Sequence, residues 1–219
     1  MRYAATAFDL DGTLCRHRQA IEPVFDGAFA DAGVERFADP GDLWPELGDI
    51  TDYDTETEQL ADAFAGLAAK RGRDLDARAL AEAFVARLDW SDVSLLPGAT
   101  AALDAARANG PVGLMTNGPA PRQSTKLDAL GLLDAFDAIV YAGDMNRRKP
   151  HPDPFERVVA GLSTPAEATL YVGDSLEHDV RGARGAGLPV AWVNPDGASP
   201  GEHAPTHDLR SVGDLGGVY

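Results

Sequence analysis

The chain of 219 residues has a single cysteine, Cys15, so it cannot form an intrachain disulfide. No apolar run approaches the roughly 20 residues that a membrane-spanning helix needs, and the first residues lack the charged and then apolar pattern of a signal peptide. These absences argue against a disulfide-stapled secreted fold and against a membrane protein, and they predict a cytoplasmic location. We interpret Cys15 as a small filler after a turn rather than as a nucleophile or a ligand.

Basic residues are also few. The sequence has 19 Lys and Arg against 35 Asp and Glu, lysine is scarce beside arginine, and the formal net charge is -16. A charge of this sign argues against binding to nucleic acid or to anionic membranes. The segment 42–62 carries eight acidic residues and no basic one. Because these acids are not grouped with the spacing of a calcium loop, we interpret them as a solvated, halophilic surface rather than as a divalent-ion or cationic-partner surface.

Short apolar runs alternate with segments of helical spacing over most of the chain. The first apolar run begins at Tyr3 and ends just before Asp9, and further runs lie at 111–116, 137–142, 168–174 and 188–194. The segments of helical spacing are 97–109, 122–130, 152–162 and 178–186. Strands that alternate with helices of this length imply right-handed crossovers and a mostly parallel sheet covered on both faces. The sequence therefore predicts an α/β fold with a doubly wound, Rossmann-like core.

Residues 16–93 lack this alternation. They contain helical patterns at 23–33, 57–70 and 76–88, and no strand of comparable strength. We predict that 16–93 is an inserted α-helical cap and that 1–15 and 94–219 together form the catalytic core. The alternative is that these helices simply pack on the core.

Polar residues follow the apolar runs where a site is expected, because ligands of doubly wound sheets bind beyond the carboxyl ends of the strands. In chain order these residues are Asp9, Asp11 and Gly12, then Thr116, Asn117 and Gly118, then Lys149, and finally Asp174 and Asp179. Two carboxylates about 6 Å apart at an effective dielectric near 20 repel by roughly 3 kcal/mol. The closely spaced Asp9 and Asp11 therefore need a nearby cation, or one of them must be protonated.

The charges of these residues are consistent with one site that binds both a cation and an anion. The carboxylates Asp9, Asp174 and Asp179 need a cation, and a hard divalent ion such as Mg2+ suits oxygen ligands. The backbone N–H groups of 117–118 precede a predicted helix and suit an anion, while Lys149 is a positive charge available to both. An anion, a cation and a carboxylate nucleophile together describe phosphoryl transfer.

The motifs "DLDGT", "TNG", the lysine of "RRKPHPDPF" and "GDSLEHD", in this order and spacing, resemble those of the haloacid dehalogenase superfamily of hydrolases. The match runs from the first residue to about Asn194, and the position of the insert resembles the helical cap of the family. Within the superfamily, "TNGPAPRQSTKL" and "GDSLEHDVRGARGAG" look most like phosphatases that act on sugar phosphates or nucleotides. The expected partner is thus a small-molecule phosphate ester, and the expected cofactor is Mg2+.

The resemblance implies a role for each residue after the first strand. Asp9 would be the nucleophile that takes the phosphoryl group as an aspartyl-phosphate. Asp11 would act as an acid toward the leaving alcohol and then as a base for the attacking water, so it would cycle between protonated and ionised states. Gly12 would allow the tight turn that lifts Asp11 out of the strand.

The resemblance also implies the groups that hold phosphate. Thr116, Asn117 and Gly118 would form the phosphate-binding turn, with Thr116 and Asn117 holding phosphate oxygens. Lys149 would neutralise charge on the nucleophile and on the phosphate, and it counts with Thr116 among the catalytic residues.

The same resemblance implies a metal site made of Asp9, the backbone carbonyl of Asp11, and Asp174. Asp179 would be an inner or a water-mediated ligand, although a first-turn helix residue that favours the macrodipole is an alternative reading. We interpret Ser175 as the N-cap of the helix that follows.

Other functions remain open on the sequence. A 2-haloacid dehalogenase shares the fold and the aspartate nucleophile, but it needs no acid for a halide leaving group, and dehalogenases of the superfamily generally lack an aspartate at the position of Asp11. A phosphomutase is possible because water and an alcohol can attack the same intermediate. A non-catalytic binding protein would keep the scaffold without turnover.

The acidic composition leads to a prediction about salt. If the surface is adapted to high salt, the melting temperature of the chain should rise with KCl into the molar range, because salt screens the repulsion among its acidic residues. Thermal unfolding at increasing KCl measures this effect. An unchanged melting temperature across the range would contradict the halophilic interpretation.

Overall fold

A computed structural model of the protein describes residues 3–48, 53 and 55–219. The chain forms two compact units, of which the first is Met1–Arg18 with Trp90–Tyr219 and the second is Gln19–Asp89. The second unit therefore lies within the predicted insert of 16–93. Part of the acidic run 42–62 falls outside the described residues.

The first unit is built on a six-stranded sheet with the strand order β5-β4-β1-β6-β7-β8. The strands are β1 (Ala5–Phe8), β4 (Val112–Thr116), β5 (Ala138–Tyr141), β6 (Thr169–Gly173), β7 (Val190–Val193) and β8 (His207–Leu209). Every pairing in this sheet is parallel, and Phe8 lies opposite Leu114 on one side and Val172 on the other. The predicted doubly wound, Rossmann-like α/β core is confirmed.

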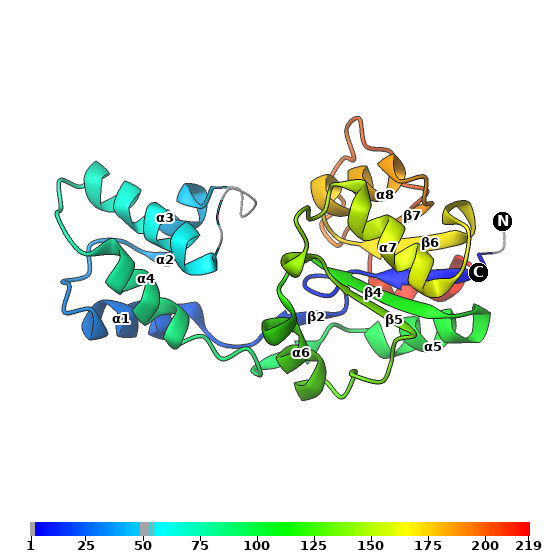
Figure 1. Cartoon of the computed structure of the whole chain (residues 1–219), viewed down its shortest axis with the longest axis horizontal. Helices are drawn as coiled ribbons and strands as arrows, with labels where there is room; N and C mark the ends of the chain where they lie inside the picture. Colours follow the sequence, from blue (N-terminus) through cyan, green and yellow to red (C-terminus); the bar gives the residue numbers. More distant parts are fainter. Residues whose placement is uncertain (1–2, 49–52, 54) are drawn as a thin grey trace. The chain divides into compact units, whose positions relative to one another are not determined.

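Helices cover both faces of this sheet (Figure 1). They are α5 (Ala99–Asn109), α6 (Ala120–Ala129), α7 (Pro152–Leu162) and α8 (Gly182–Gly185). Short 3-10 helices span Ala142–Asp144, Ala166–Ala168 and Val212–Gly217. Successive residues of a strand point to opposite faces, and Phe8 accordingly packs with residues of α5 and α6 while Ala7 packs with residues of α7 and α8. Because both faces are buried, the strands read as short, continuous apolar runs.

The second unit is helical. Its helices are α1 (Ile21–Asp31), α2 (Pro40–Leu43), the 3-10 helix Trp44–Glu46, α3 (Glu56–Lys70) and α4 (Ala77–Ala86). Phenylalanines form its centre, with ring centroids 5.1 to 6.2 Å apart, and they are Phe25, Phe29, Phe37, Phe64 and Phe84. This separate apolar core agrees with the amphipathic patterns of 23–33, 57–70 and 76–88.

Some elements differ from the sequence prediction. An antiparallel ribbon of β2 (Cys15–His17) and β3 (Val93–Leu95) flanks the insert, although no strand was predicted there. Strand β8 follows a turn-rich loop and was also missed. These strands are three residues long, so they are too short for an alternation of apolar and polar residues to be recognised. The helix predicted at 178–186 is a π-helix at Leu176–Arg181 that leads into α8.

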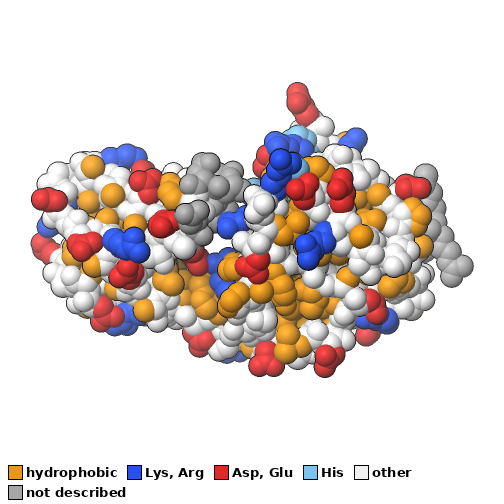
Figure 2. All heavy atoms as spheres, in the orientation of Figure 1, with side chains coloured by type: hydrophobic (Ala, Val, Ile, Leu, Met, Phe, Trp, Pro, Cys, Tyr) orange, Lys and Arg blue, Asp and Glu red, His pale blue; other side chains and the backbone are white. Residues whose placement is uncertain are grey.

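Within the described residues, none of the helices combines the length and the apolar character needed to cross a membrane. On the face drawn in Figure 2, acidic and basic side chains are interspersed on both units. In the second unit several acids pair with arginine or lysine, for example Asp42 with Arg71 at 2.6 Å and Glu46 with Lys70 at 2.5 Å. Part of the acidic run is thus used in surface ion pairs.

Candidate active site

The candidate site lies at the carboxyl ends of the central strands. Strand β1 pairs with β4 and β6, so the residues that follow these parallel strands meet at one edge of the sheet. Asp9 follows β1 directly, Thr116 ends β4, and Asp174 follows β6. The fold therefore brings together residues that lie far apart in the sequence, at the position where doubly wound sheets bind ligands.

A buried ammonium group is at the centre of this edge. Lys149 Nζ donates to Asp9 Oδ1 at 2.6 Å and to Asp179 Oδ1 at 2.8 Å, and all three side chains are at least nine-tenths buried. The Tyr171 hydroxyl lies 3.1 Å from both Lys149 Nζ and Asp179 Oδ1. Buried charges need partners of this kind, since an unpaired ion in the interior carries a large desolvation penalty.

The charges around Lys149 do not balance. Burial by itself would lower the pKa of Lys149, but Asp179 and Asp9 outweigh burial, so its pKa is raised and the ammonium stays charged. Burial, together with the charges of Asp179 and Asp174, raises the pKa of Asp9 well above its ordinary value despite the opposing effect of Lys149. Burial and Asp179 likewise raise the pKa of Asp174 to about 6. Negative charge is thus in excess here, and an added cation would stabilise the ionised carboxylates.

The excess negative charge coincides with a cluster of possible metal ligands. Asp9, Asp174 and Asp179 each offer a carboxylate oxygen, and these oxygens lie within 4.8 Å of one another. Among the described residues no other group of this kind is found. Carboxylate oxygens are the ligands that hard divalent cations prefer, so these residues fit Mg2+.

Gly12 makes room for the cluster. Its φ of +81° is a left-handed conformation that favours glycine, and a Cβ at this position would lie 2.3 Å from Asp174 Oδ2. Thr13 Oγ1 donates to Asp174 Oδ1 at 3.3 Å, and Trp192 Nε1 donates to the Asp174 carbonyl at 2.8 Å. The turn after β1 and strand β7 therefore both fix the position of Asp174.

Asp179 is held by the start of the π-helix. Ser175 Oγ accepts from the His178 N–H at 3.1 Å, which confirms Ser175 as an N-cap. The Ser175 N–H donates to Asp179 Oδ2 at 3.0 Å, while Asp179 Oδ1 faces Lys149. Since both oxygens already have protein partners, Asp179 fixes the lysine at least as much as it could serve a metal.

The turn after β4 is used partly for internal contacts. Asn117 donates through Nδ2 to the Lys149 carbonyl at 3.0 Å and accepts from the Lys149 N–H at 2.9 Å. The Gly118 N–H donates to Thr116 Oγ1 at 3.2 Å. The Asn117 side chain therefore clamps the backbone of Lys149, and the Gly118 N–H, which was expected to face an anion, supports the Thr116 hydroxyl instead. The phosphate contact expected of Asn117 stays a prediction.

Asp11 has partners that the sequence analysis did not identify. Lys126 Nζ donates to its two carboxylate oxygens at 2.7 and 2.9 Å, and Gln123 Nε2 donates to Oδ2 at 2.9 Å. Burial would raise the pKa of Asp11, but the Lys126 charge and the hydrogen bonds from Lys126 and Gln123 outweigh burial and lower it. Without a ligand Asp11 is ionised, so the protonated state expected for an acid requires a change in its surroundings.

Sequence reasoning missed four residues of this site, and each left a weak signal. Tyr171 places a hydroxyl in the middle of the buried strand β6, and Trp192 places an indole N–H in the apolar strand β7. Gln123 and Lys126 are spaced i, i+3 beside the buried Leu127, so a polar pair falls on the buried face of α6.

Cys15 is buried near Asp11, with Sγ 3.9 Å from Oδ1. Burial and the charge of Asp11 raise the pKa of its thiol to about 12. The thiolate is therefore not formed near neutral pH, and the interpretation of Cys15 as a filler is consistent with this environment.

Comparison with known proteins places this geometry in a family. Residues 3–187 match the family model of haloacid dehalogenase-like hydrolases. The chain belongs to this family. The chain is 35% identical over 213 residues to phosphoglycolate phosphatase of Cereibacter sphaeroides, and this match covers 94% of this chain and 90% of that protein.

Other known proteins share parts of the sequence or the whole fold. A phosphoserine phosphatase of Thermus thermophilus is 38% identical over 144 residues, which covers 65% of this chain and 56% of that protein. The protein YfnB of Bacillus subtilis, solved with magnesium bound, is 25% identical to this chain with a TM-score of 0.78, and the match covers 100% of this chain and 99% of that one. A 2-haloacid dehalogenase of Pseudomonas syringae is 26% identical with a TM-score of 0.67 and covers 99% and 97%.

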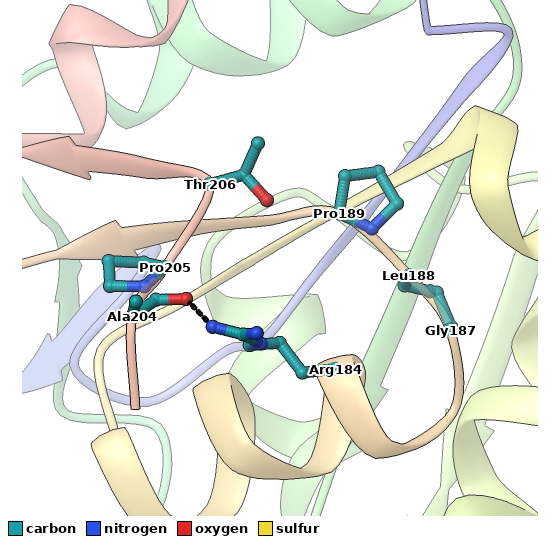
Figure 3. Close-up of a pocket in the computed structure, with 7 residues that line it drawn as sticks. All are labelled: Arg184, Gly187, Leu188, Pro189, Ala204, Pro205 and Thr206. Atoms are coloured by element: carbon teal, nitrogen blue, oxygen red, sulfur yellow. Dashed lines mark hydrogen bonds between the residues drawn. The ribbon is translucent and has the colours of Figure 1, made fainter. Parts of the chain in front are cut away.

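A separate hollow of about 410 Å³ lies at the opposite edge of the sheet (Figure 3). Pro189 and Thr206 on its wall precede β7 and β8, whereas the candidate site follows the strands. Arg184 donates to the Ala204 carbonyl, and Thr206 Oγ1 accepts from the Val190 N–H at 3.0 Å. These polar groups are used within the protein, and the hollow shares no lining residue with the candidate site.

The pKa of Asp174 leads to a prediction for the chain in EDTA. An unfolded aspartate ionises near its ordinary pKa of 3.8, whereas Asp174 holds its proton to about pH 6 in the fold. Its stabilising contribution is therefore complete below pH 4 and is lost as the pH rises through 6. Because Asn resembles the protonated acid, the melting temperature of Asp174→Asn minus that of the native chain should increase between pH 4 and 7. A constant difference would contradict the assignment.

Mg2+ should reverse this penalty. At 100 times its Kd, a cation that binds only the folded chain adds about 2.7 kcal/mol of stability, or roughly 5 to 10 °C in melting temperature. We expect this shift at pH 7.5 for the native chain and little of it for Asp174→Asn. Asp128→Asn, an exposed acid on α6, is the matched control and should respond to Mg2+ like the native chain. Equal shifts for all three chains would contradict a metal site at Asp174.

Proposed function

We propose that the chain is a Mg2+-dependent phosphatase that hydrolyses a small-molecule phosphomonoester, such as a sugar phosphate or a nucleotide, through an aspartyl-phosphate on Asp9. The observation that carries this proposal is the arrangement of two carboxylates at the end of β1. Asp9 is buried against Lys149, and Asp11 stands two residues on with its side chain 40% exposed. One carboxylate is thus held in place as a nucleophile, and the other is open to a leaving group.

The residues of the chain account for the first half of the reaction. A carboxylate oxygen of Asp9 attacks phosphorus, the bond to the ester oxygen breaks, and the leaving alkoxide takes a proton from Asp11. Asp11 is ionised in the free chain, but a bound phosphate dianion adds negative charge nearby and raises its pKa, which favours the protonated acid. Lys149 stabilises the charge on the nucleophile and on the phosphoryl group.

In the second half, water attacks the aspartyl-phosphate. Asp11, now ionised, accepts the proton of the water, and Asp9 is released as a carboxylate together with inorganic phosphate. Asp9, Asp174 and the Asp11 carbonyl would hold Mg2+, with Asp179 as an inner or a water-mediated ligand. When bound, Mg2+ would supply positive charge that reduces the repulsion between these carboxylates and phosphate.

The Thr116 hydroxyl is prepared to bind a phosphate oxygen. Its oxygen accepts from the Gly118 N–H at 3.2 Å and from Gln123 Nε2 at 2.8 Å. A hydroxyl oxygen has two acceptor positions and one donor hydrogen. Since both acceptor positions are in use, the hydrogen is available to donate to a ligand. This supports a role for Thr116 in holding the phosphoryl group.

The dehalogenase alternative has one observation in its favour, the likeness to the Pseudomonas syringae dehalogenase. A halide leaves without a proton, so that chemistry gives no use to a second carboxylate held beside the nucleophile. Asp11 has that position here, with hydrogen bonds from Lys126 and Gln123. The phosphatase relatives and Asp11 together favour phosphate ester hydrolysis.

Activity on p-nitrophenyl phosphate tests the proposal. We expect Mg2+-dependent release of phosphate that EDTA abolishes, and loss of turnover to background in Asp9→Asn, because the amide cannot form the acyl phosphate. The measurement should span low to molar KCl, and sugar phosphates, nucleotides and phosphoglycolate then identify the preferred ester. Absence of phosphate release at every salt concentration, or chloride release from 2-chloropropionate, would contradict the proposal.

Substitutions of Asp11 and Asp174 should separate the effect on catalysis from the effect on metal binding. Asp11→Asn should lower kcat by about 10²- to 10⁴-fold, the usual contribution of a general acid or base. It should leave Mg2+ affinity largely unchanged, because the proposed metal contact of Asp11 is through its backbone. Asp174→Asn should weaken Mg2+ binding, measured by calorimetry. Comparable loss of Mg2+ affinity in both variants would mean that the roles of Asp11 and Asp174 are wrongly assigned.

A further inference from the structure

Two buried polar side chains on α6 have no role in the four motifs. Gln123 is 1% exposed and Lys126 is 2% exposed, although the buried face of a helix is ordinarily apolar. Lysine is also rare in this chain, which has only Lys70, Lys126 and Lys149. Lys149 and Lys126 are both buried against carboxylates of the candidate site, whereas Lys70 is exposed. Burial of a scarce lysine at this place needs an explanation.

The contacts of these side chains converge on the two groups that would meet a substrate. Lys126 reaches both carboxylate oxygens of Asp11 at 2.7 and 2.9 Å. The Gln123 amide donates to Asp11 Oδ2 at 2.9 Å and to Thr116 Oγ1 at 2.8 Å, so it links the end of β1 to the end of β4. Three donated hydrogen bonds fix the orientation of a carboxylate that is still 40% exposed.

The orientation of Gln123 follows from the same contacts. Its Nε2 faces a carboxylate and a hydroxyl, and its Oε1 is buried without a hydrogen-bond partner among the described residues. Reversal of the amide would place Oε1 against the carboxylate of Asp11, where two acceptors repel. The side chain therefore leaves one acceptor unpaired and uses both N–H groups to hold Asp11 and Thr116.

An aromatic ring borders the ammonium group of Lys126. Lys126 Nζ lies 5.4 Å from the ring centroid of Trp90, and the Arg122 guanidinium lies 4.8 Å from the same centroid. A cation near an aromatic ring is attracted to its face, and a bulky ring also limits the positions that a lysine can take. Trp90 thus helps to keep Lys126 directed at Asp11.

We propose that Gln123 and Lys126 are positioning residues that hold the Asp11 carboxylate and the Thr116 hydroxyl in place toward a bound phosphate ester. The inference rests on the proposed function, because Asp11 has to serve a leaving alcohol for its orientation to matter. In this role Lys126 and Gln123 do not touch the substrate. They act through the direction in which Asp11 and Thr116 face it.

Two substrates that differ in their leaving group distinguish this role from a structural one. Phenol is a weaker acid than p-nitrophenol, so phenyl phosphate depends more on proton donation by Asp11 than p-nitrophenyl phosphate does. Both esters give the same phosphoenzyme, and kcat/KM reports the steps up to its formation. A variant with a misplaced Asp11 should therefore lose more kcat/KM with phenyl phosphate, while a merely weakened fold should lose the same factor with both.

The expected outcome for the full chain with Mg2+ is a selective loss. Lys126→Met should reduce kcat/KM for phenyl phosphate about tenfold more than for p-nitrophenyl phosphate, within the range that acid catalysis supplies. Inhibition by inorganic phosphate should be little changed. Lys126→Arg keeps a cation beside Asp11 and should show a smaller selective loss. Gln123→Met should show the selective loss and also weaker inhibition by phosphate, because Thr116 loses a donor.

A surface variant serves as the control, and different outcomes would contradict this inference and the proposed function. Asp128→Asn changes an exposed residue of the same helix and should match the native chain with both esters. Equal losses with the two esters, or none, would overturn the inference and leave the proposed function intact. If Lys126→Met does not fold, Gln123→Met and Lys126→Arg decide by the same ratio. A native chain that hydrolyses neither ester would overturn the proposed function, and this inference with it.

Discussion

The ion pairs of Lys149 are the interaction on which the site depends. Its ammonium lies between Asp9 and Asp179, whose side chains are at least nine-tenths buried, and Tyr171 and Asn117 hold its side chain and its backbone. Removal of one partner from a buried ion pair typically costs about 3 to 5 kcal/mol, because the remaining charge is left without compensation. The same arrangement keeps Asp9 close to a positive charge and leaves a surplus of negative charge for a cation. Local stability and the proposed chemistry thus depend on the same contacts.

The predictable part of the fold is the part with long, repeated patterns. The apolar runs that became β1, β4, β5, β6 and β7 were recognisable because both faces of the sheet are covered. In the insert, the buried residues of α1, α3 and α4 follow helical spacing. The three-residue strands β2, β3 and β8 carry no such pattern. Their pairing depends on where the ends of the insert and the last loop are placed by the tertiary structure, which local sequence does not determine.

The site was predictable to the extent that it follows strand ends. Asp9, Thr116 and Asp174 could be grouped because parallel strands end at one edge. The side-chain partners could not be predicted in the same way. Asn117 follows β4 at the expected place for a phosphate contact, yet its side-chain amide binds the backbone of Lys149. Gln123 contacts Asp11 although it lies 112 positions further along the chain. Such contacts depend on the packing of α6 and of the loop before α7 against the sheet, and a motif contains no information about that packing.

The two aspartates after β1 are only two residues apart in the sequence, and the structure gives each carboxylate its own lysine. Lys149 serves Asp9 inside the sheet edge, and Lys126 serves Asp11 from α6. A lysine ammonium is a compact charge with three donors, and Lys149 uses it to reach Asp9, Asp179 and the Tyr171 hydroxyl. Although the chain uses arginine for most of its basic residues, the cations beside these two carboxylates are both lysines. The separate environments also give the carboxylates opposite pKa shifts, raised for Asp9 and lowered for Asp11, so two identical side chains can take different parts in one reaction.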